Sequence, residues 1–147
     1  MRKNSGFTLM ELMVVIGIIA VLAALLAPNF IGWMPQYRLK SAVMELGARV
    51  QQARLAAIKE NQNCTMSFNT GNHTYNITCL DNMTVDLTDY GPNVLFTAVS
   101  SPQVINFTSR GLTDGIGTFV VSMASQGGGD TYSIRITPTG AVATEKL

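Results

Sequence analysis

The chain is poor in charge and in the side chains that catalysis and metal binding usually require. Only 13% of its 147 residues are charged, and it contains one His, one Trp and two Cys. No Gly-x-Ser-x-Gly motif is present, and the glycine-rich stretch 126–130 lacks the Lys-Ser/Thr of a phosphate-binding loop. The acidic residues are scattered, which disfavours catalysis by paired carboxylates. These absences predict a protein that is not an enzyme and that needs no cofactor.

The charges that are present divide the chain into parts. The first six residues are polar and basic, whereas Leu12 to Ala27 contain only apolar residues and Gly. Basic residues then outnumber acidic ones as far as residue 61, and the rest of the chain is mildly acidic. We therefore expect four segments, with these bounds: 1–6, 7–34, 35–61 and 62–147.

Residues 7–61 are expected to form one long helix. Its first half, 7–34, is apolar on every side, and its second half, 35–61, is amphipathic. In the second half apolar residues recur at helical spacing: Leu39, Val43, Leu46, Val50, Ala53 and Ala57. Because a proline inside a helix removes a backbone hydrogen bond, we expect a kink or local melting at Pro28 and Pro35.

The rest of the chain is predicted to form strands, so that a long helix packs on a small antiparallel β-sheet domain in an α+β fold. Polar and apolar residues alternate in 64–68 and in 75–79, and a type II′ turn at Gly71-Asn72 would join the two runs. The register of this hairpin pairs Phe68 with Tyr75, Met66 with Ile77 and Cys64 with Cys79. Further strands are expected in 93–99, 103–109, 117–125 and 131–144. The last of these ranges is expected to form a hairpin that turns at 138–140.

The apolar first half of the helix contains a single charged residue, Glu11. A secretory signal peptide would have an uncharged core, and Pro28 would block its cleavage site. A plain signal anchor would use 7–34 as the span, with Arg2 and Lys3 in the cytoplasm and the C-terminal domain outside. The anchor leaves a carboxylate unpartnered in lipid, which costs up to about 3 kcal/mol at the centre of a span.

Cleavage between Gly6 and Phe7 would supply the missing partner. Phe7 would then carry a new cationic amine one helical turn away from Glu11 and on the same face. The carboxylate would pair with this amine or with that of a neighbouring subunit, and pairing between subunits would drive association and set their axial register.

The two cysteines fall in the part of the chain that would then lie in an oxidising compartment. Directly opposite positions in the hairpin bring Cys64 and Cys79 within reach of a disulfide. In this register they form a hydrogen-bonded pair, which has the wider Cα spacing, so two buried thiols stay open as the alternative. No metal site is expected, because only His73 could join the cysteines and it falls at the hairpin tip.

The stretch GFTLMEL at 6–12 resembles the class III signal of type IV prepilins and type II secretion pseudopilins, in which a basic leader and a Gly-Phe junction precede a Glu and an apolar helix. The stretches at 104–121 and 132–144 are similar to the β-domain of the GspH/FimT group of minor pilins and pseudopilins. The resemblance implies that residues 1–6 are a prepilin leader, that a prepilin peptidase cleaves after Gly6 and N-methylates Phe7, and that Glu11 sets the register of assembly.

The resemblance further implies a structural minor pseudopilin of a type II secretion pseudopilus. The chain would enter the bacterial inner membrane as a single span, with a cytoplasmic N-terminus and a periplasmic C-terminal domain, and would then be extracted into a periplasmic filament. The implied partners are other pilin or pseudopilin subunits, the prepilin peptidase, an inner-membrane assembly platform and, before assembly, membrane lipid.

Two alternatives stay open. The first is a FimT-like minor pilin of a type IV pilus, acting in pilus assembly or DNA uptake. Minor pilins that bind DNA commonly carry Gly-Arg-x-Arg on their C-terminal strands, where Ala141 and Ala143 stand here, so nucleic-acid binding is not expected. The second is a monomeric membrane-anchored binding domain, which would keep its Met1.

Overall fold

The computed structural model describes residues 7–114, 117–126 and 129–147, except for the side chains of 26–32. The chain divides into two units, one as far as Met34 and the other from Pro35 to Leu147. Gly6, one side of the predicted cleavage site, lies outside the described residues.

The helix α1 runs from Leu9 to Glu60. It ends where Asn61 takes the left-handed conformation, with φ 52°. The Asn61 amide donates to the carbonyl oxygen of Ile58 at 3.3 Å, and the Gln62 amide donates to that of Ala57 at 3.2 Å. These bonds satisfy carbonyls that a helix end otherwise leaves unpaired.

The first unit is helical and exposed. Every residue from Phe7 to Leu25 is exposed. Within the described residues, no helix is both long enough and apolar enough to cross a membrane. The predicted span 7–34 includes the seven residues whose side chains lie outside the description. The helix assignment continues through Pro28 and Pro35, and the kink expected there stays a prediction.

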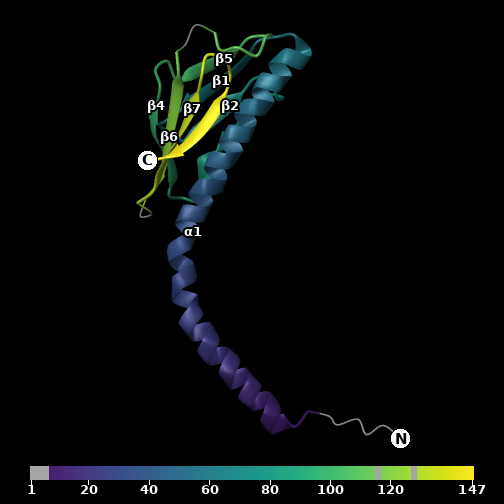
Figure 1. Ribbon diagram of the computed structural model, residues 1–147, viewed down its shortest axis with the longest axis vertical. Helices are drawn as coiled ribbons and strands as arrows, with labels where there is room; N and C mark the ends of the chain where they lie inside the picture. The colour runs from purple at the N-terminus through teal and green to yellow at the C-terminus, as the bar shows by residue number, and fades with distance from the viewer. Residues whose placement is uncertain (1–6, 115–116, 127–128) are drawn as a thin grey trace, which may run out of the picture. The chain divides into compact units, whose positions relative to one another are not determined.

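In the part of the second unit that the structure describes, eight strands form two four-stranded antiparallel sheets. The first sheet has the order β3-β2-β1-β5 and consists of β1 (Cys64–Asn69), β2 (Thr74–Ile77), β3 (Met83–Asp86) and β5 (Val104–Phe107). The second has the order β4-β6-β7-β8 and consists of β4 (Val94–Val99), β6 (Phe119–Ser125), β7 (Thr131–Ile136) and β8 (Val142–Lys146). A short 3-10 helix, η1 (Leu87–Asp89), connects the two sheets. Within this unit, the second half of α1 lies along the strands (Figure 1).

The helix and the sheets share one hydrophobic core, because each presents its apolar side chains with its own period. All six residues of the predicted stripe of α1 are at most 1% exposed, which confirms the amphipathic prediction for this half of the helix. The ring of Phe68 in β1 contacts the rings of Phe96 in β4 and Phe119 in β6, with centroids 5.9 and 5.5 Å apart. These contacts join the two sheets and confirm the α+β fold, a long helix packed on antiparallel sheets.

The β1–β2 hairpin has the predicted register but a different turn. Phe68 pairs with Tyr75 and Met66 with Ile77, as the alternation predicted. The positive φ in this turn belongs to His73, at 53°, rather than to Gly71 as a type II′ turn requires. The turn closes instead through the side-chain oxygen of Asn69, which accepts from the amides of Gly71 and Asn72 at 2.9 and 3.1 Å.

Two features of the second unit escaped the sequence analysis. The predicted antiparallel β-domain consists of two sheets, and this division was not predicted, because which strands pair depends on contacts between distant residues. The strand β3 and the helix η1 were not foreseen. The alternation of polar and apolar residues in 83–86 is too short to indicate a strand by itself. The helix η1 is capped by the side chain of Asp86, which accepts from the Thr88 amide at 2.8 Å.

Candidate functional site

The first turn of α1 brings Thr8 and Glu11 together. The Glu11 amide donates to Oγ1 of Thr8 at 3.2 Å, and the Leu12 amide donates to the Thr8 carbonyl oxygen at the same distance. Thr8 is therefore the N-cap. Glu11 follows three positions later in the first turn, where the negative charge of its carboxylate interacts favourably with the helix dipole. The Thr-x-x-Glu spacing in the sequence is the signal for this cap, although no role was predicted for Thr8.

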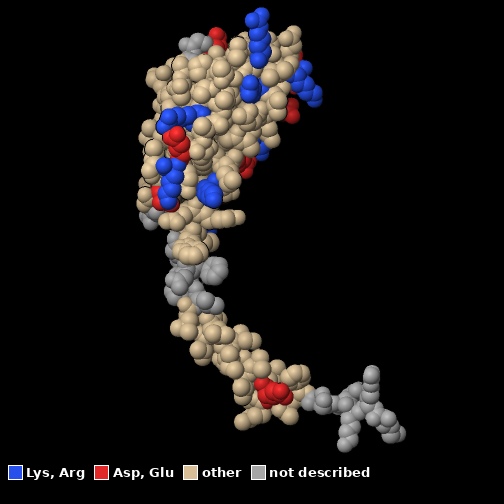
Figure 2. All heavy atoms as spheres, in the orientation of Figure 1, with Lys and Arg blue, Asp and Glu red and all other residues tan. Residues whose placement is uncertain are grey.

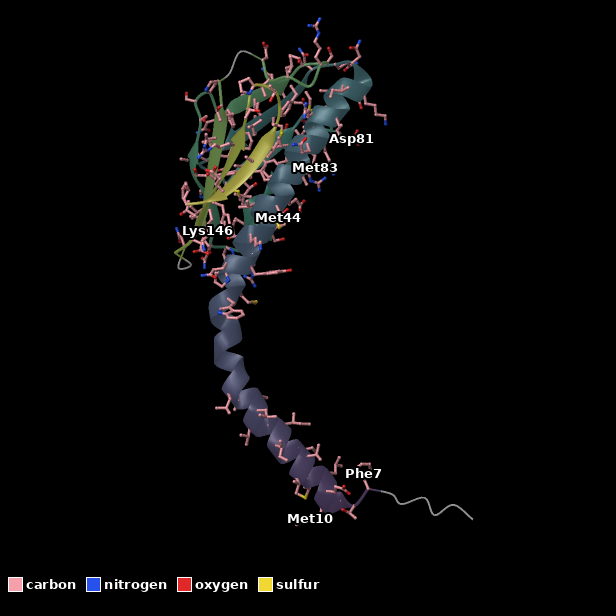
Figure 3. The ribbon with its side chains drawn as sticks, viewed as in Figure 1. Phe7, Met10, Met44, Asp81, Met83 and Lys146 are labelled. Atoms are coloured by element: carbon pink, nitrogen blue, oxygen red, sulfur yellow. A yellow bond between two sulfur atoms is a disulfide. The ribbon has the colours of Figure 1, made fainter. Side chains whose placement is uncertain are left out.

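Glu11 is the sole charged side chain of residues 7–34. Its apolar neighbours are open to the surroundings, with Phe7 83% and Met10 73% exposed, and both project from this end of the helix (Figure 3). Figure 2 shows one acidic group on the otherwise uncharged visible surface of this segment. Among the described residues Glu11 has no ion-pair partner. Its carboxylate is thus available to a cation from outside the described part of the chain.

A disulfide joins Cys64 at the start of β1 to Cys79 just after β2. Their Cα atoms are 5.2 Å apart, which lies within the range that a disulfide spans. Cys64 is fully buried, and Sγ of Cys79 lies 3.8 Å from the carbonyl oxygen of Ala53 in α1. The bridge therefore packs against the helix at the point where helix and sheet meet.

Within the described ranges, no three or more His, Cys, Asp and Glu side chains are grouped so as to hold a metal ion. His73 lies in the β1–β2 turn, and its Nδ1 accepts from the Phe96 amide of β4 at 3.3 Å. The only histidine therefore has a structural contact between the two sheets.

Arg54 of α1 contacts two loops of the β-domain. Its Nε donates to the carbonyl oxygen of Gly111 at 2.9 Å. A Cβ at Gly140, in the turn between β7 and β8, would lie 2.5 Å from that same oxygen and 2.7 Å from Nε of Arg54. Both glycines have positive φ, 73° and 74°, so each is suited to its turn and leaves room for the arginine. Arg54 thus connects the helix to both loops.

The basic residues near the C-terminus are paired with acidic ones. Arg135 of β7 forms an ion pair with Glu145 of β8, and Nζ of Lys146 lies 2.9 Å from Oδ2 of Asp130. The hydrogen bond to Asp130 raises the pKa of Lys146. This end of the second sheet therefore carries mixed charge, and charges of both signs are visible on it in Figure 2.

Two family models match the chain. Residues 1–27 match the prokaryotic N-terminal methylation motif. Residues 42–140, more than half of the chain, match the family described as type II transport protein GspH. The type II secretion system core protein G of Vibrio cholerae is 29% identical over 111 residues, a match that covers 76% of this chain and 61% of that protein.

Solved structures share the fold at low sequence identity. The type IV minor pilin FimU of Pseudomonas aeruginosa superposes with a TM-score of 0.60 at 16% identity, over 75% of this chain and 90% of FimU. The minor pseudopilin EpsH of the Vibrio cholerae type 2 secretion system superposes with a TM-score of 0.57 at 12% identity, over 74% of this chain and 96% of EpsH. At these identities the likeness concerns the fold alone.

The amphipathic helix, the two sheets and the Arg54 contact all lie in or directly beside the stretch that the GspH model matches, and the Thr8–Glu11 cap lies within the methylation motif. The chain belongs to the family of type II transport protein GspH.

Proposed function

We propose that this chain is a minor subunit of a type II secretion pseudopilus. It is held in the bacterial inner membrane by a single span within 7–34, with the N-terminus cytoplasmic and residues 62–147 periplasmic. A prepilin peptidase cuts after Gly6 and methylates the Phe7 amine. The assembly platform then moves the subunit into a filament, where its helix packs with those of other subunits. The observation that carries the proposal is Glu11, the sole charge of the segment 7–34, in which residues 7–25 are exposed.

The physical basis of assembly is the pairing of Glu11 with a cation. A carboxylate among acyl chains is costly unless a positive charge lies close to it. The methylated amine of Phe7 stays cationic, and Phe7 is the first residue of the segment that contains Glu11. A pair between the Glu11 carboxylate of one subunit and the amine of its neighbour lowers the free energy of the assembled state and sets one axial register.

The charge of the β-domain favours secretion over DNA uptake. Binding to DNA requires basic side chains that neutralise phosphates. Here Arg135 and Lys146 are already paired with Glu145 and Asp130. The resemblance to FimU concerns the fold and does not alter this balance. A type IV pilus minor pilin is the alternative, and a gel-shift of the full chain in detergent with duplex DNA at low salt tests it. A shift that weakens as salt is added would favour the pilus.

Processing is tested with Gly6→Ala. This variant should accumulate as the full-length precursor, while the wild-type chain should yield N-methyl-Phe7 as its first residue in mass spectrometry. Lys3→Ala serves as the control in the same leader and should be cut. A native chain that keeps residues 1–6 would contradict both the cleavage and the proposed function, and would favour a monomeric anchored domain.

Assembly is tested with Glu11→Ala. The variant should insert in the membrane as the wild-type chain does, but should be recovered with isolated pseudopili at a much lower level. Glu60→Ala removes an exposed carboxylate from the other end of the same helix and should assemble normally. Equal recovery of the Glu11 variant and the wild type would mean that the carboxylate plays no part in assembly.

A further inference from the structure

A small cavity lies where the second half of α1 meets the loop before β4. Its volume is about 20 Å³, and it is lined by Pro35 and Arg38 of α1, by the loop 91–94 and by Ser125 at the end of β6. This volume is sufficient for one water molecule, which requires at least about 10–15 Å³, and is too small for a phosphate or a metabolite.

Ser125 is the polar group that makes this cavity unusual. It is only 5% exposed, and no described residue donates to or accepts from its Oγ. A buried hydroxyl without a partner is costly, so native proteins satisfy such groups with protein or with ordered water. The carbonyls of the loop already take part in other bonds: that of Asn93 accepts from the Gln126 amide and that of Gly91 from the Val94 amide, at 2.9 and 3.1 Å.

Arg38 supplies a second polar group to the cavity. Its side chain lies over Gly91, so that a Cβ on that glycine would be 3.0 Å from Cδ and 3.2 Å from Nη1 of Arg38. Gly91 also has a φ of 154°, which favours glycine. The guanidinium therefore approaches the cavity because Gly91 has no side chain. Of the other lining residues, Pro35, Pro92 and Val94 are apolar, and Asn93 is polar.

We propose that this cavity is a binding site for one structural water molecule, held between Oγ of Ser125 and the guanidinium of Arg38. The water completes the hydrogen bonding of Ser125 and connects β6 of the second sheet to the beginning of the amphipathic half of α1. The site goes beyond the function proposed above, because it concerns how the β-domain is joined to its helix and does not depend on cleavage or assembly.

The first test compares two serine variants of the full chain in detergent by thermal unfolding. Ser125→Ala takes a partner from the water and should lower Tm by about 4 °C or more. Ser133→Ala is the matched control, since Ser133 is 3% exposed, has an Oγ equally without a partner among the described residues, and does not line this cavity. Removing a hydroxyl that is unpaired should leave Tm unchanged or raise it. The proposal is overturned if Ser125→Ala behaves like Ser133→Ala.

The second test detects the water directly, first in the wild-type chain and then in one variant. In the wild-type chain, the amide protons of Asn93 and Ser125 should show a cross-relaxation peak to a long-lived water in NMR spectra. The peak should weaken in Arg38→Met, which keeps the aliphatic stem over Gly91 and removes the guanidinium. Absence of the peak in the wild type, or a peak that Arg38→Met leaves at full strength, would overturn the proposed site.

Discussion

Nε of Arg54 donates to the carbonyl oxygen of Gly111 at 2.9 Å, and this bond joins the helix α1 to a loop of the β-domain. The space for it depends on Gly140, which lies against both partners. A contact of this kind joins residues 57 positions apart in the sequence. It therefore reports directly on whether the helix and the sheets are correctly packed.

Gly140→Ala should destabilise the β-domain. The new Cβ would lie 2.5 Å from the Gly111 oxygen and 2.7 Å from Nε of Arg54, at a residue whose φ is 74°. Strain of this kind costs about 1–3 kcal/mol, and the displaced bond adds to it. Gly47→Ala is the control, because a Cβ there meets nothing within 4 Å and should raise stability by about 0.5–1 kcal/mol. Urea unfolding of both variants measures the difference, and equal midpoints would refute the tight contact.

Loss of the disulfide should destabilise the domain without changing the fold. The bridge closes a loop with a sequence separation of 15 residues, so its removal in Cys64→Ala/Cys79→Ala should cost about 3 kcal/mol. Urea unfolding of the wild type with and without a reductant gives the same comparison. A midpoint that is insensitive to both changes would show that the two sulfurs are not bonded in the native chain.

Thr8→Val should loosen the first turn of α1. The variant keeps the shape of the side chain but cannot accept from the Glu11 amide, and the loss of an N-cap costs about 1 kcal/mol. Hydrogen exchange at the Glu11 amide, measured on the mature chain in detergent, should quicken by about fivefold. Thr8→Ser retains the oxygen and should exchange like the wild type. Identical rates in Thr8→Val and Thr8→Ser would mean that the cap does not form.

Stability should fall at alkaline pH because two tyrosines resist ionisation. Burial, followed by the hydrogen bond to Glu45, raises the pKa of Tyr90 to about 12, and burial raises that of Tyr75 as well. The unfolded chain loses these protons near pH 10, so the stabilisation is complete below that pH and is lost as the pH rises toward about 12. Tyr90→Phe should lose less stability between pH 8 and pH 11 than the wild type. A parallel decline would exclude Tyr90 as the cause.

Features that depend on a local period follow from the amino-acid sequence alone. The stripe of apolar residues in the second half of α1 and the register of the β1–β2 hairpin follow from side chains repeating every three to four residues, or every two. The Thr-x-x-Glu pattern that caps the helix was equally readable, because a cap involves neighbours in the chain. The composition of residues 1–12 carried the resemblance on which the functional expectation rested.

Which distant groups meet depends on tertiary packing and cannot be read from the sequence. No local pattern reveals that the strands divide into two sheets, that Phe68 joins them, or that Arg54 reaches Gly111. The buried hydroxyl of Ser125, which has no partner among the described residues, and the cavity beside Arg38 arise in the same way. Each results from packing between residues far apart in the chain. The same local patterns allow many arrangements, and the fit of side-chain shapes together with the pairing of buried polar groups selects one of them.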